Sequence, residues 1–241
     1  MDRASGHVDP AISSLSELRL SNQTLDSIIG RIGDVALQTL RGWDAIGASL
    51  VEGDRVATYG TNDPRINRVD QAQYDSGRGP CVDATADDEF KYFDGTEVPP
   101  RWRQFSEAAA DADVYSVVSF PLRVDGKVMG ALNFYSRERD ALRRGQREEG
   151  TLFAAQAAVT LANAKALIER GQKVGQLEEA LETRTIIGQA TGLLMAQEGL
   201  TSDEAFQKLV TVSQNANIKL RDIAQRYVQS LQDKLSQREP A

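Results

Sequence analysis

The feature that most constrains the fold is a helical pattern in the C-terminal part of the chain that no proline interrupts. From about Gln146 onwards apolar residues recur at helical spacing, and the next proline in the chain is Pro240. Because proline breaks helices, its absence over so many residues allows one very long helix. Gly199 is a suitable end for that helix, since glycine accepts the left-handed conformation of a C-terminal cap.

Two shorter helices are expected after Gly199. Thr201 followed by Glu204 has the spacing of a capping box, which opens a second helix. Asn217 is a suitable N-cap for a third helix. The residues expected to form the core of this all-helical part are Ile187, Ala190, Leu194, Phe206, Leu209, Leu220, Ile223 and Ala224.

The chain before this region alternates short strands and helices, which is an α+β pattern. Asp125-Gly126 lies between two apolar runs and predicts a tight hairpin turn. Residues 1–20 are polar and mixed, and they predict a flexible leader; residues 60–80 predict a loop with a short helix. The expected strands are 45–51, 55–59, 89–93, 116–122 and 128–135, and the expected helices are 24–40 and 102–112.

Composition excludes several kinds of chemistry. The 241 residues include one cysteine, Cys81, and one histidine, His7, so a disulfide framework, a catalytic triad and a multi-cysteine zinc site are not expected. We expect no metal, no cofactor and no enzymatic activity. The N-terminus has no signal-peptide pattern, and no unbroken apolar run approaches the roughly 20 residues of a membrane span. We therefore expect a cytoplasmic protein without a membrane contact.

A weak heptad pattern lies in the middle of the long helix. Leu167, Val174 and Leu181 are seven residues apart, and Leu177 falls at the matching position between two of them. Arg170 and Arg184 interrupt this pattern. Two readings stay open, a helix that pairs with a second copy in a homodimer and an amphipathic helix that packs on its own domain.

The C-terminal blocks Arg184–Met195, Ser202–Phe206 and Ser213–Ala224 closely resemble the ANTAR domain, an RNA-binding module of bacterial transcription antiterminators. The first part resembles a GAF domain of the kind that is fused to ANTAR modules. The blocks that carry this second resemblance are Gln73–Ala84, Arg101-Trp102, Ser119–Leu122 and Gly130–Ser136.

The two resemblances imply a domain order and a function. The expected segments are a leader at 1–20, a GAF-like sensor domain at 21–165, a helical linker at 166–182 and an ANTAR domain at 183–236. The expected fold is a GAF-type antiparallel sheet flanked by helices, a long linking helix and a three-helix unit. The implied function is transcription antitermination, in which the GAF domain receives a small molecule or another signal and the ANTAR domain binds hairpins in nascent mRNA. The alternative is a dimeric signalling adaptor that binds proteins and has no RNA specificity of its own.

Candidate RNA-binding residues follow from the ANTAR resemblance and from the polar residues left outside the core. Residues 1–172 carry most of the net charge of −7, whereas residues 173–241 hold eight basic and nine acidic side chains, so a polyanion site has to be a local patch. Asn217, Lys219 and Arg221 are expected near the positive end of the third helix. Either they contact RNA, or Asn217 is only a cap and the two cations are solvated. Many ANTAR sequences carry a basic residue where Thr191 stands. The candidates are Arg184, Gln189, Thr191, Lys208, Gln214, Asn217, Lys219 and Arg221.

A ligand pocket in the GAF-like domain is the second candidate site. Five residues could line it, and they could equally be core: Tyr74, Cys81, Trp102, Phe120 and Phe134. Cys81 follows Gly79-Pro80 and precedes an expected short helix, a position that lowers the pKa of a thiol. The alternative for Cys81 is a small buried apolar residue.

Overall fold

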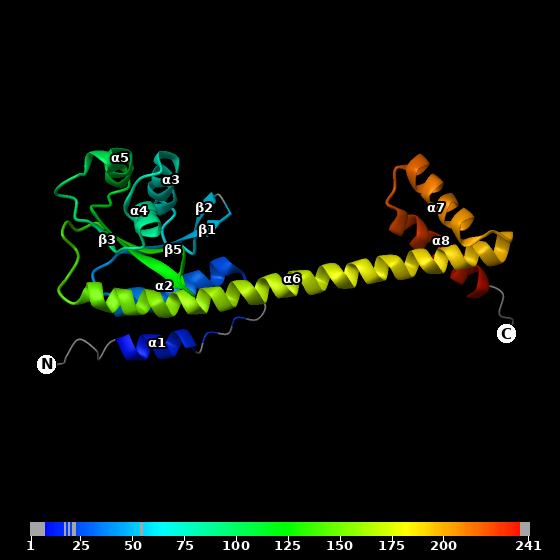
Figure 1. Cartoon of the computed structure of the whole chain (residues 1–241), viewed down its shortest axis with the longest axis horizontal. Coiled ribbons are helices and arrows are strands. Elements are labelled where there is room, and N and C mark those ends of the chain that lie inside the picture. The colour runs from blue at the N-terminus through cyan, green and yellow to red at the C-terminus, as the bar shows by residue number, and fades with distance from the viewer. Residues whose placement is uncertain (1–7, 17, 19, 21–22, 54, 237–241) are drawn as a thin grey trace. The chain divides into compact units, whose positions relative to one another are not determined.

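The computed structural model describes residues 8–16, 18, 20, 23–53 and 55–236, and it divides the chain into two compact units, residues 1–168 and 169–241. The helix α6 (Gln146–Glu198) runs through the boundary between them without a break, as the proline-free pattern predicts (Figure 1).

The first unit is built on a five-stranded antiparallel sheet with the strand order β2-β1-β5-β4-β3. β4 and β5 meet at the predicted hairpin turn, where Asp125 and Gly126 both have positive φ. The strands lie where alternation and turn signals place them: β1 (Ala45–Glu52), β2 (Arg55–Tyr59), β3 (Lys91–Phe93), β4 (Ser116–Val124) and β5 (Lys127–Ser136).

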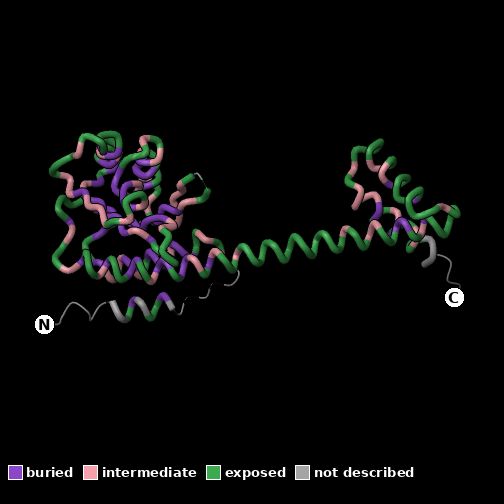
Figure 2. The backbone as a smooth tube through the Cα atoms, in the orientation of Figure 1, coloured by how far each residue is buried: buried purple, intermediate pink, exposed green. Residues whose placement is uncertain are grey.

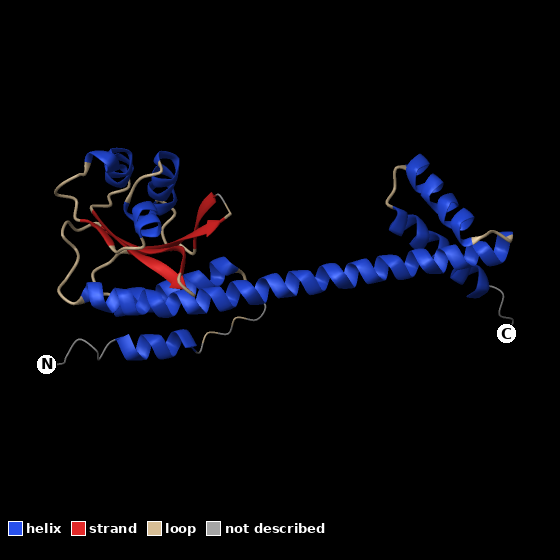
Figure 3. Ribbon diagram, viewed as in Figure 1, coloured by secondary structure: helices blue, strands red, loops and turns tan. Residues whose placement is uncertain are grey.

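Helices cover both faces of this sheet (Figure 3). They are α2 (Leu25–Thr39), α3 (Ile66–Ser76), α4 (Pro80–Asp87), a short 3₁₀ turn η1 (Pro100–Trp102), α5 (Arg103–Asp111) and the first half of α6, while α1 (Val8–Ser16) packs on α2. The prediction of a flexible leader is wrong for Val8–Ser16, which form α1. Ala11 and Leu15 are buried there, so this helix adds to the core. Residues 1–7, 17 and 19 of the predicted leader lie outside the described residues.

One face of the sheet forms an apolar core with α1, α2 and α6. Residues paired across the strands, such as Ile46 with Phe134 and Phe120 with Leu132, point to this side. The first half of α6 contributes Phe153, Ala154, Ala157, Ala158, Leu161 and Ala164, all buried (Figure 2). By length and composition α6 is also apolar enough to cross a membrane. The buried residues of its first half are a sufficient reason for that composition.

The other face of the sheet lies under α3, α4 and α5. Val117 and Tyr135 pack there with Phe93, Trp102 and Phe105. Further along the same face, the paired residues are small or polar: Ser49 opposite Ala131, and Ser119 opposite Asn133. This face therefore has an apolar end under α5 and a polar part under α3 and α4.

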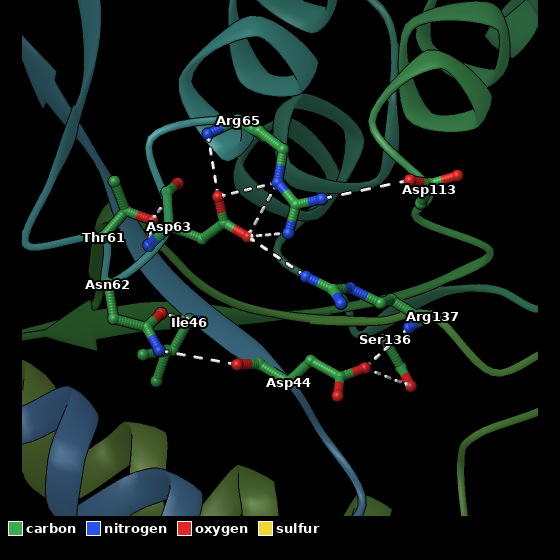
Figure 4. A network of polar contacts seen from close by, with 9 residues as sticks. All are labelled: Asp44, Ile46, Thr61, Asn62, Asp63, Arg65, Asp113, Ser136 and Arg137. Carbon is green, nitrogen blue, oxygen red and sulfur yellow. Dashed lines mark hydrogen bonds and ion pairs between the residues drawn. The ribbon is translucent and has the colours of Figure 1, made fainter.

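A polar network fixes the loop that leads from β2 into α3 (Figure 4). Asn62 accepts a hydrogen bond from the backbone N–H of Ile46 at 3.0 Å, and Asp44 accepts one from the N–H of Arg137 at 2.7 Å. Asp63 forms an ion pair with Arg65 at 2.6 Å, which lowers the pKa of Asp63. These bonds hold the start of α3 against the ends of β1 and β5.

The second unit contains the C-terminal part of α6 together with α7 (Ser202–Ala216) and α8 (Leu220–Ser236). Thr201 and Glu204 form the predicted capping box at the start of α7. The buried residues are Ala190, Leu194, Ala205, Leu209, Ala224 and Val228, with Ile187, Leu220 and Ile223 packed against them. The small side chains of Ala190, Ala205 and Ala224 let the three helices approach closely.

Two predictions for this unit are wrong. Asn217 does not open the third helix. It ends α7 in the left-handed conformation (φ 52°, ψ 42°), which asparagine tolerates better than most residues, and α8 begins only at Leu220. Phe206 is not core, since 38% of it is exposed. Helical spacing places Phe206 beside Leu209, but the neighbouring helices do not cover it.

Candidate functional site

The start of α8 carries a charged side chain with two carboxylate neighbours. Arg221 lies in the first turn of α8, and its Nη1 donates to Glu179 Oε1 of α6 at 2.7 Å. Its Nε lies 3.6 Å from Asp222 Oδ1. The bond with Glu179 raises the pKa of Arg221. A predicted phosphate contact is thus already paired with a carboxylate in the free protein.

Glu179 also lines a groove of about 570 Å³ on the surface of α6 and α7. Its apolar wall consists of Ala180, Ile187 and Phe206, and Arg184 is the basic residue among the lining side chains. The structure therefore brings Arg184 and Arg221 to one place, since Arg184 lines the groove and Arg221 holds a carboxylate that lines it.

Three further candidates surround the turn between α7 and α8. Gln214, Asn217 and Lys219 are all exposed. The carbonyl of Lys219 accepts from the N–H of Ile223, so Lys219 occupies the position just before the first turn of α8 rather than a position inside the helix. Lys219 and Arg221 lie at the positive end of α8, where anions are favoured.

The remaining candidates do not join this group. Lys208 of α7 forms an ion pair with Glu198. Gln189 lines a different groove, between α6 and α8, together with Leu193 and Val228. Thr191 is only 8% exposed, and its hydroxyl donates to the carbonyl of Ile187 at 2.8 Å, so its contact with RNA stays a prediction without a free hydroxyl to support it.

The five predicted pocket residues of the first unit do not form one site. Phe120 and Phe134 belong to the core on the α2 and α6 side of the sheet, where their ring centroids lie 5.9 Å apart. Tyr74, Cys81 and Trp102 belong to the opposite face. The prediction of a shared pocket is corrected accordingly: aromatic residues of neighbouring strands share a pocket only where their side chains point to the same side of the sheet.

Sequence reasoning missed a buried polar cluster on that opposite face. Asp70 of α3 is fully buried and accepts hydrogen bonds from Tyr135 at 2.6 Å, Thr58 at 2.8 Å and Gln73 at 3.0 Å. Burial raises the pKa of Asp70 to about 6, and these three bonds oppose that shift. The spacing of Asp70, Gln73 and Tyr74 indicates that they share one helix face. That spacing does not predict which strand residues they contact.

The cluster extends across the sheet to β4. Tyr74 and Asn133 both donate to Ser49 Oγ, each at 2.8 Å. Among the residues that the structure describes, Ser119 Oγ and Asn133 Oδ1 are buried without a hydrogen-bond partner, and these two residues are paired in register across β4 and β5. Buried polar groups of this kind are rare, so the pair has hydrogen-bonding capacity that the surrounding side chains leave unused.

Cys81 is a buried residue rather than an activated thiol. Only 1% of it is exposed, and its backbone N–H donates to Gln73 Oε1 at 2.9 Å. Burial raises the pKa of the thiol well above its ordinary value. Reactive cysteines have the opposite shift and an accessible sulfur.

The comparisons with known proteins agree with this division of the chain. The profile of the GAF domain family matches residues 22–162, and the profile of the ANTAR domain family matches residues 175–228. A search of curated proteins gave no match.

Three solved structures illustrate the similarity of fold. The GAF domain of a Coxiella burnetii phosphoenolpyruvate-protein phosphotransferase is 13% identical, with 68% of this chain and 98% of that one covered and a TM-score of 0.53. Free methionine-R-sulfoxide reductase of Neisseria meningitidis, solved with its substrate, is 16% identical, with 69% and 94% covered and a TM-score of 0.52. The Acinetobacter phosphotransferase GAF domain is 13% identical, with 70% and 99% covered and a TM-score of 0.50. At these identities the likeness shows the fold alone.

The two units correspond to the two family matches, the sheet domain to GAF and the three-helix unit to ANTAR. The chain belongs to the GAF domain family and carries a C-terminal ANTAR domain. Together these domains define a sensory input and an RNA-binding output.

Proposed function

We propose that this protein is a cytoplasmic, signal-responsive regulator whose ANTAR domain binds hairpins in nascent mRNA and prevents a terminator from forming. The observation that carries the proposal is the placement of Arg184, Lys219 and Arg221 within an ANTAR domain, with the two latter residues at the positive end of α8. RNA sequence is read mainly in loops whose bases are splayed out, and phosphates beside such a loop need positive charge.

The GAF domain supplies the input in this proposal. The unpartnered Ser119 Oγ and Asn133 Oδ1 support contact with a small polar ligand on the sheet face under α3 and α4. Such a ligand changes RNA binding only where it binds two states of the protein with different affinity. The candidate for the two-state element is α6, because this one helix belongs to both units.

A homodimer is part of the same proposal. The apolar residues Leu167, Val174, Leu177 and Leu181 are 45–64% exposed and lie along one side of α6. Their exposure argues against the reading in which this stretch packs on its own domain. A second copy of α6 is a partner with the matching pattern.

We further propose that the protein catalyses no reaction and has no membrane contact. Support for the first statement comes from Cys81, which is the only cysteine, is buried and has a raised pKa. Thiol chemistry of the kind that sulfoxide reduction needs has no accessible nucleophile among the described residues.

The experiment that tests the proposal is sequencing of the RNAs that copurify with the full chain after crosslinking. We expect transcripts that share a hairpin loop upstream of a terminator, and we expect them to be depleted in the double variant Lys219→Ala/Arg221→Ala. Recovery of unrelated RNAs that disappear at moderate salt would contradict the proposal and favour the adaptor without RNA specificity.

A further inference from the structure

We propose that the groove between α6 and α7 of the ANTAR domain holds one unstacked base of the bound RNA loop, with Phe206 as its stacking surface. This inference rests on the proposed function and deepens it, because it names the part of the RNA that the groove takes. The groove is lined by Gln176, Glu179, Ala180, Thr183, Arg184, Ile187 and Phe206.

The exposure of Phe206 is the first argument. Ala205 and Leu209 of the same helix are buried, whereas Phe206 is 38% exposed although it is the largest apolar side chain of α7. A single exposed apolar residue on a flat surface is common and needs no explanation. Phe206 instead lies beside Ala180 and Ile187 of α6, and the three side chains form the apolar wall of a shallow, solvent-open groove.

The size and polarity of the groove fit a flat aromatic ligand. Its volume of about 570 Å³ lies within the range of ordinary small-molecule sites. Apolar side chains form its wall, and Gln176 and Thr183 supply donors and acceptors for the edge of a base. Bases of single-stranded RNA stack on aromatic side chains and hydrogen-bond along their edges in this way.

Two guanidinium groups at the rim, one of them paired with a carboxylate in the free protein, point to a nucleotide rather than to an apolar peptide. Arg184 lines the groove, and Arg221 donates to Glu179, which also lines it. A guanidinium group binds phosphate oxygens in a bidentate manner and also stacks on bases. A base in the groove therefore has Arg184 beside it for its phosphate, and Arg221 as well once phosphate replaces Glu179.

The groove is also separate from the surface proposed for a second copy of the chain. An α-helix turns by about 100° per residue, so Thr183 lies about 200° around α6 from Leu181. Thr183 and Ile187 line the groove, whereas Leu181 and Val174 belong to the exposed apolar stripe on the opposite side. A second α6 on that stripe leaves the groove accessible.

The test uses the full chain and a fluorescein-labelled hairpin RNA that carries the loop shared by the copurified transcripts. In a second set of hairpins each loop base is replaced in turn by 2-aminopurine, whose fluorescence is quenched by stacking. The variants are Phe206→Leu, which keeps an apolar side chain without a ring, and Phe206→Trp, which keeps a ring. Val212→Ala is the matched control, since Val212 is a second exposed apolar residue of α7.

We expect one loop position to be quenched on binding to the wild type. Phe206→Leu should weaken hairpin binding roughly tenfold or more and abolish that quenching, because one base–aromatic stack is lost. Phe206→Trp should keep both affinity and quenching, and Val212→Ala should bind as the wild type does. Circular dichroism of each variant shows that it is folded, and Phe206→Trp tests the ring even where the leucine variant unfolds.

Three outcomes overturn the inference, and they are distinguishable from failure of the proposed function. In the first, the wild type binds the hairpin and folded Phe206→Leu binds it equally well with unchanged quenching. In the second, Phe206→Leu converts a dimer to a monomer in sedimentation, which makes the groove a protein contact. In the third, folded Phe206→Trp loses affinity and quenching as Phe206→Leu does. Absence of any hairpin binding by the wild type would instead contradict the function on which the inference rests.

Discussion

The guanidinium group of Arg221 can bind either of two anions. In the free protein it binds the carboxylate of Glu179, and in the proposed complex it binds a phosphate. The bond to Glu179 is 2.7 Å long, yet both side chains are partly exposed. Exposed ion pairs contribute little to stability because water screens them. The pair is therefore weak enough for RNA to replace it, and Glu179 competes with the phosphate for the guanidinium group.

Replacing Glu179 should strengthen RNA binding. In Glu179→Gln the guanidinium of Arg221 no longer has this carboxylate as a competitor, so we expect a several-fold higher hairpin affinity in an anisotropy titration. Arg221→Ala should weaken binding roughly tenfold and make the salt dependence shallower by about one phosphate contact. Glu178→Gln, which changes the net charge equally one residue away, is the control. Equal affinities for Glu179→Gln and Glu178→Gln would show that only net charge matters.

The buried carboxyl of Asp70 should make the first unit less stable as the pH rises. Its pKa is raised to about 6 in the folded protein from an ordinary value near 3.8, mainly by burial. The folded state therefore binds the proton more tightly than the unfolded state does. The stabilisation from protonated Asp70 is complete below about pH 4 and is lost as the pH rises to about 6, a change of roughly 3 kcal/mol.

Asp70→Asn should remove this part of the pH dependence. Urea unfolding at several pH values between 4 and 7 measures it, with Asp75→Asn at an exposed position of the same helix as the control. A wild-type slope that persists in Asp70→Asn would assign the pH dependence to other groups.

The two halves of α6 are one helix with different surroundings. The first half buries six apolar residues in the core of the first unit, whereas residues 169–182 are exposed throughout. Helix propensity and the absence of proline explain the continuity of the element, but not which side of it is covered. Substitutions in the first half should therefore change the stability of the core. Substitutions in the second half should change the association of two copies.

Gly150 tests packing in the first half of α6. A glycine-to-alanine change inside a helix ordinarily stabilises it by about 1 kcal/mol. At Gly150 an added Cβ would overlap the ring of Phe120, which is buried in the core. We expect Gly150→Ala to lower the midpoint of thermal unfolding, and Gly30→Ala in α2, where an added Cβ meets nothing within 4 Å, to leave it unchanged or raise it. A raised midpoint for Gly150→Ala would contradict this packing.

Leu177 tests association through the second half of α6. Leu177→Asp places a charge on the exposed apolar stripe, so we expect the proposed dimer to dissociate in sedimentation experiments. Gln172→Asp, which adds the same charge on the opposite side of the helix, should leave the dimer intact. A wild type that stays monomeric at high micromolar concentrations would refute the coiled-coil contact.

Elements of the fold could be predicted from sequence more fully than the surfaces that they form. Strand alternation, the Asp125-Gly126 turn and the capping box at Thr201 are local signals, and the structure confirms each of them. Asn217 was assigned to the wrong helix because asparagine is a good cap at either end. The prediction that Phe206 is core is wrong because helical spacing does not say which neighbour covers a given side. The bonds from Asp70 to Thr58 and Tyr135 join three separate elements, and no pattern within one element predicts them.

At the scale of the whole molecule, the proposed mechanism is a competition between two structures of one RNA. The protein supplies no covalent step in this mechanism, so its effect depends only on its affinity for one of the two structures. The signal changes transcription only where ligand binding to the sensory domain changes the affinity for RNA, and that change is at most the ratio of the ligand's affinities for the two states. Two quantities therefore determine the effect on transcription. They are the affinity of the protein for the hairpin and the change in that affinity when the signal binds.

The first of these quantities can be tested by transcription in vitro. On a template in which the shared hairpin precedes a terminator, we expect the purified chain to increase readthrough by RNA polymerase in a saturable manner, with half-maximal effect near its hairpin affinity. The double variant Lys219→Ala/Arg221→Ala should not increase readthrough, because its contacts to phosphate are lost. Exchanging both strands of the hairpin stem for another complementary pair should preserve readthrough, whereas changing the loop should abolish it, since the loop is the part of the RNA whose bases can be read. Normal hairpin binding without any change in readthrough would show that the protein regulates its transcripts by a step other than termination.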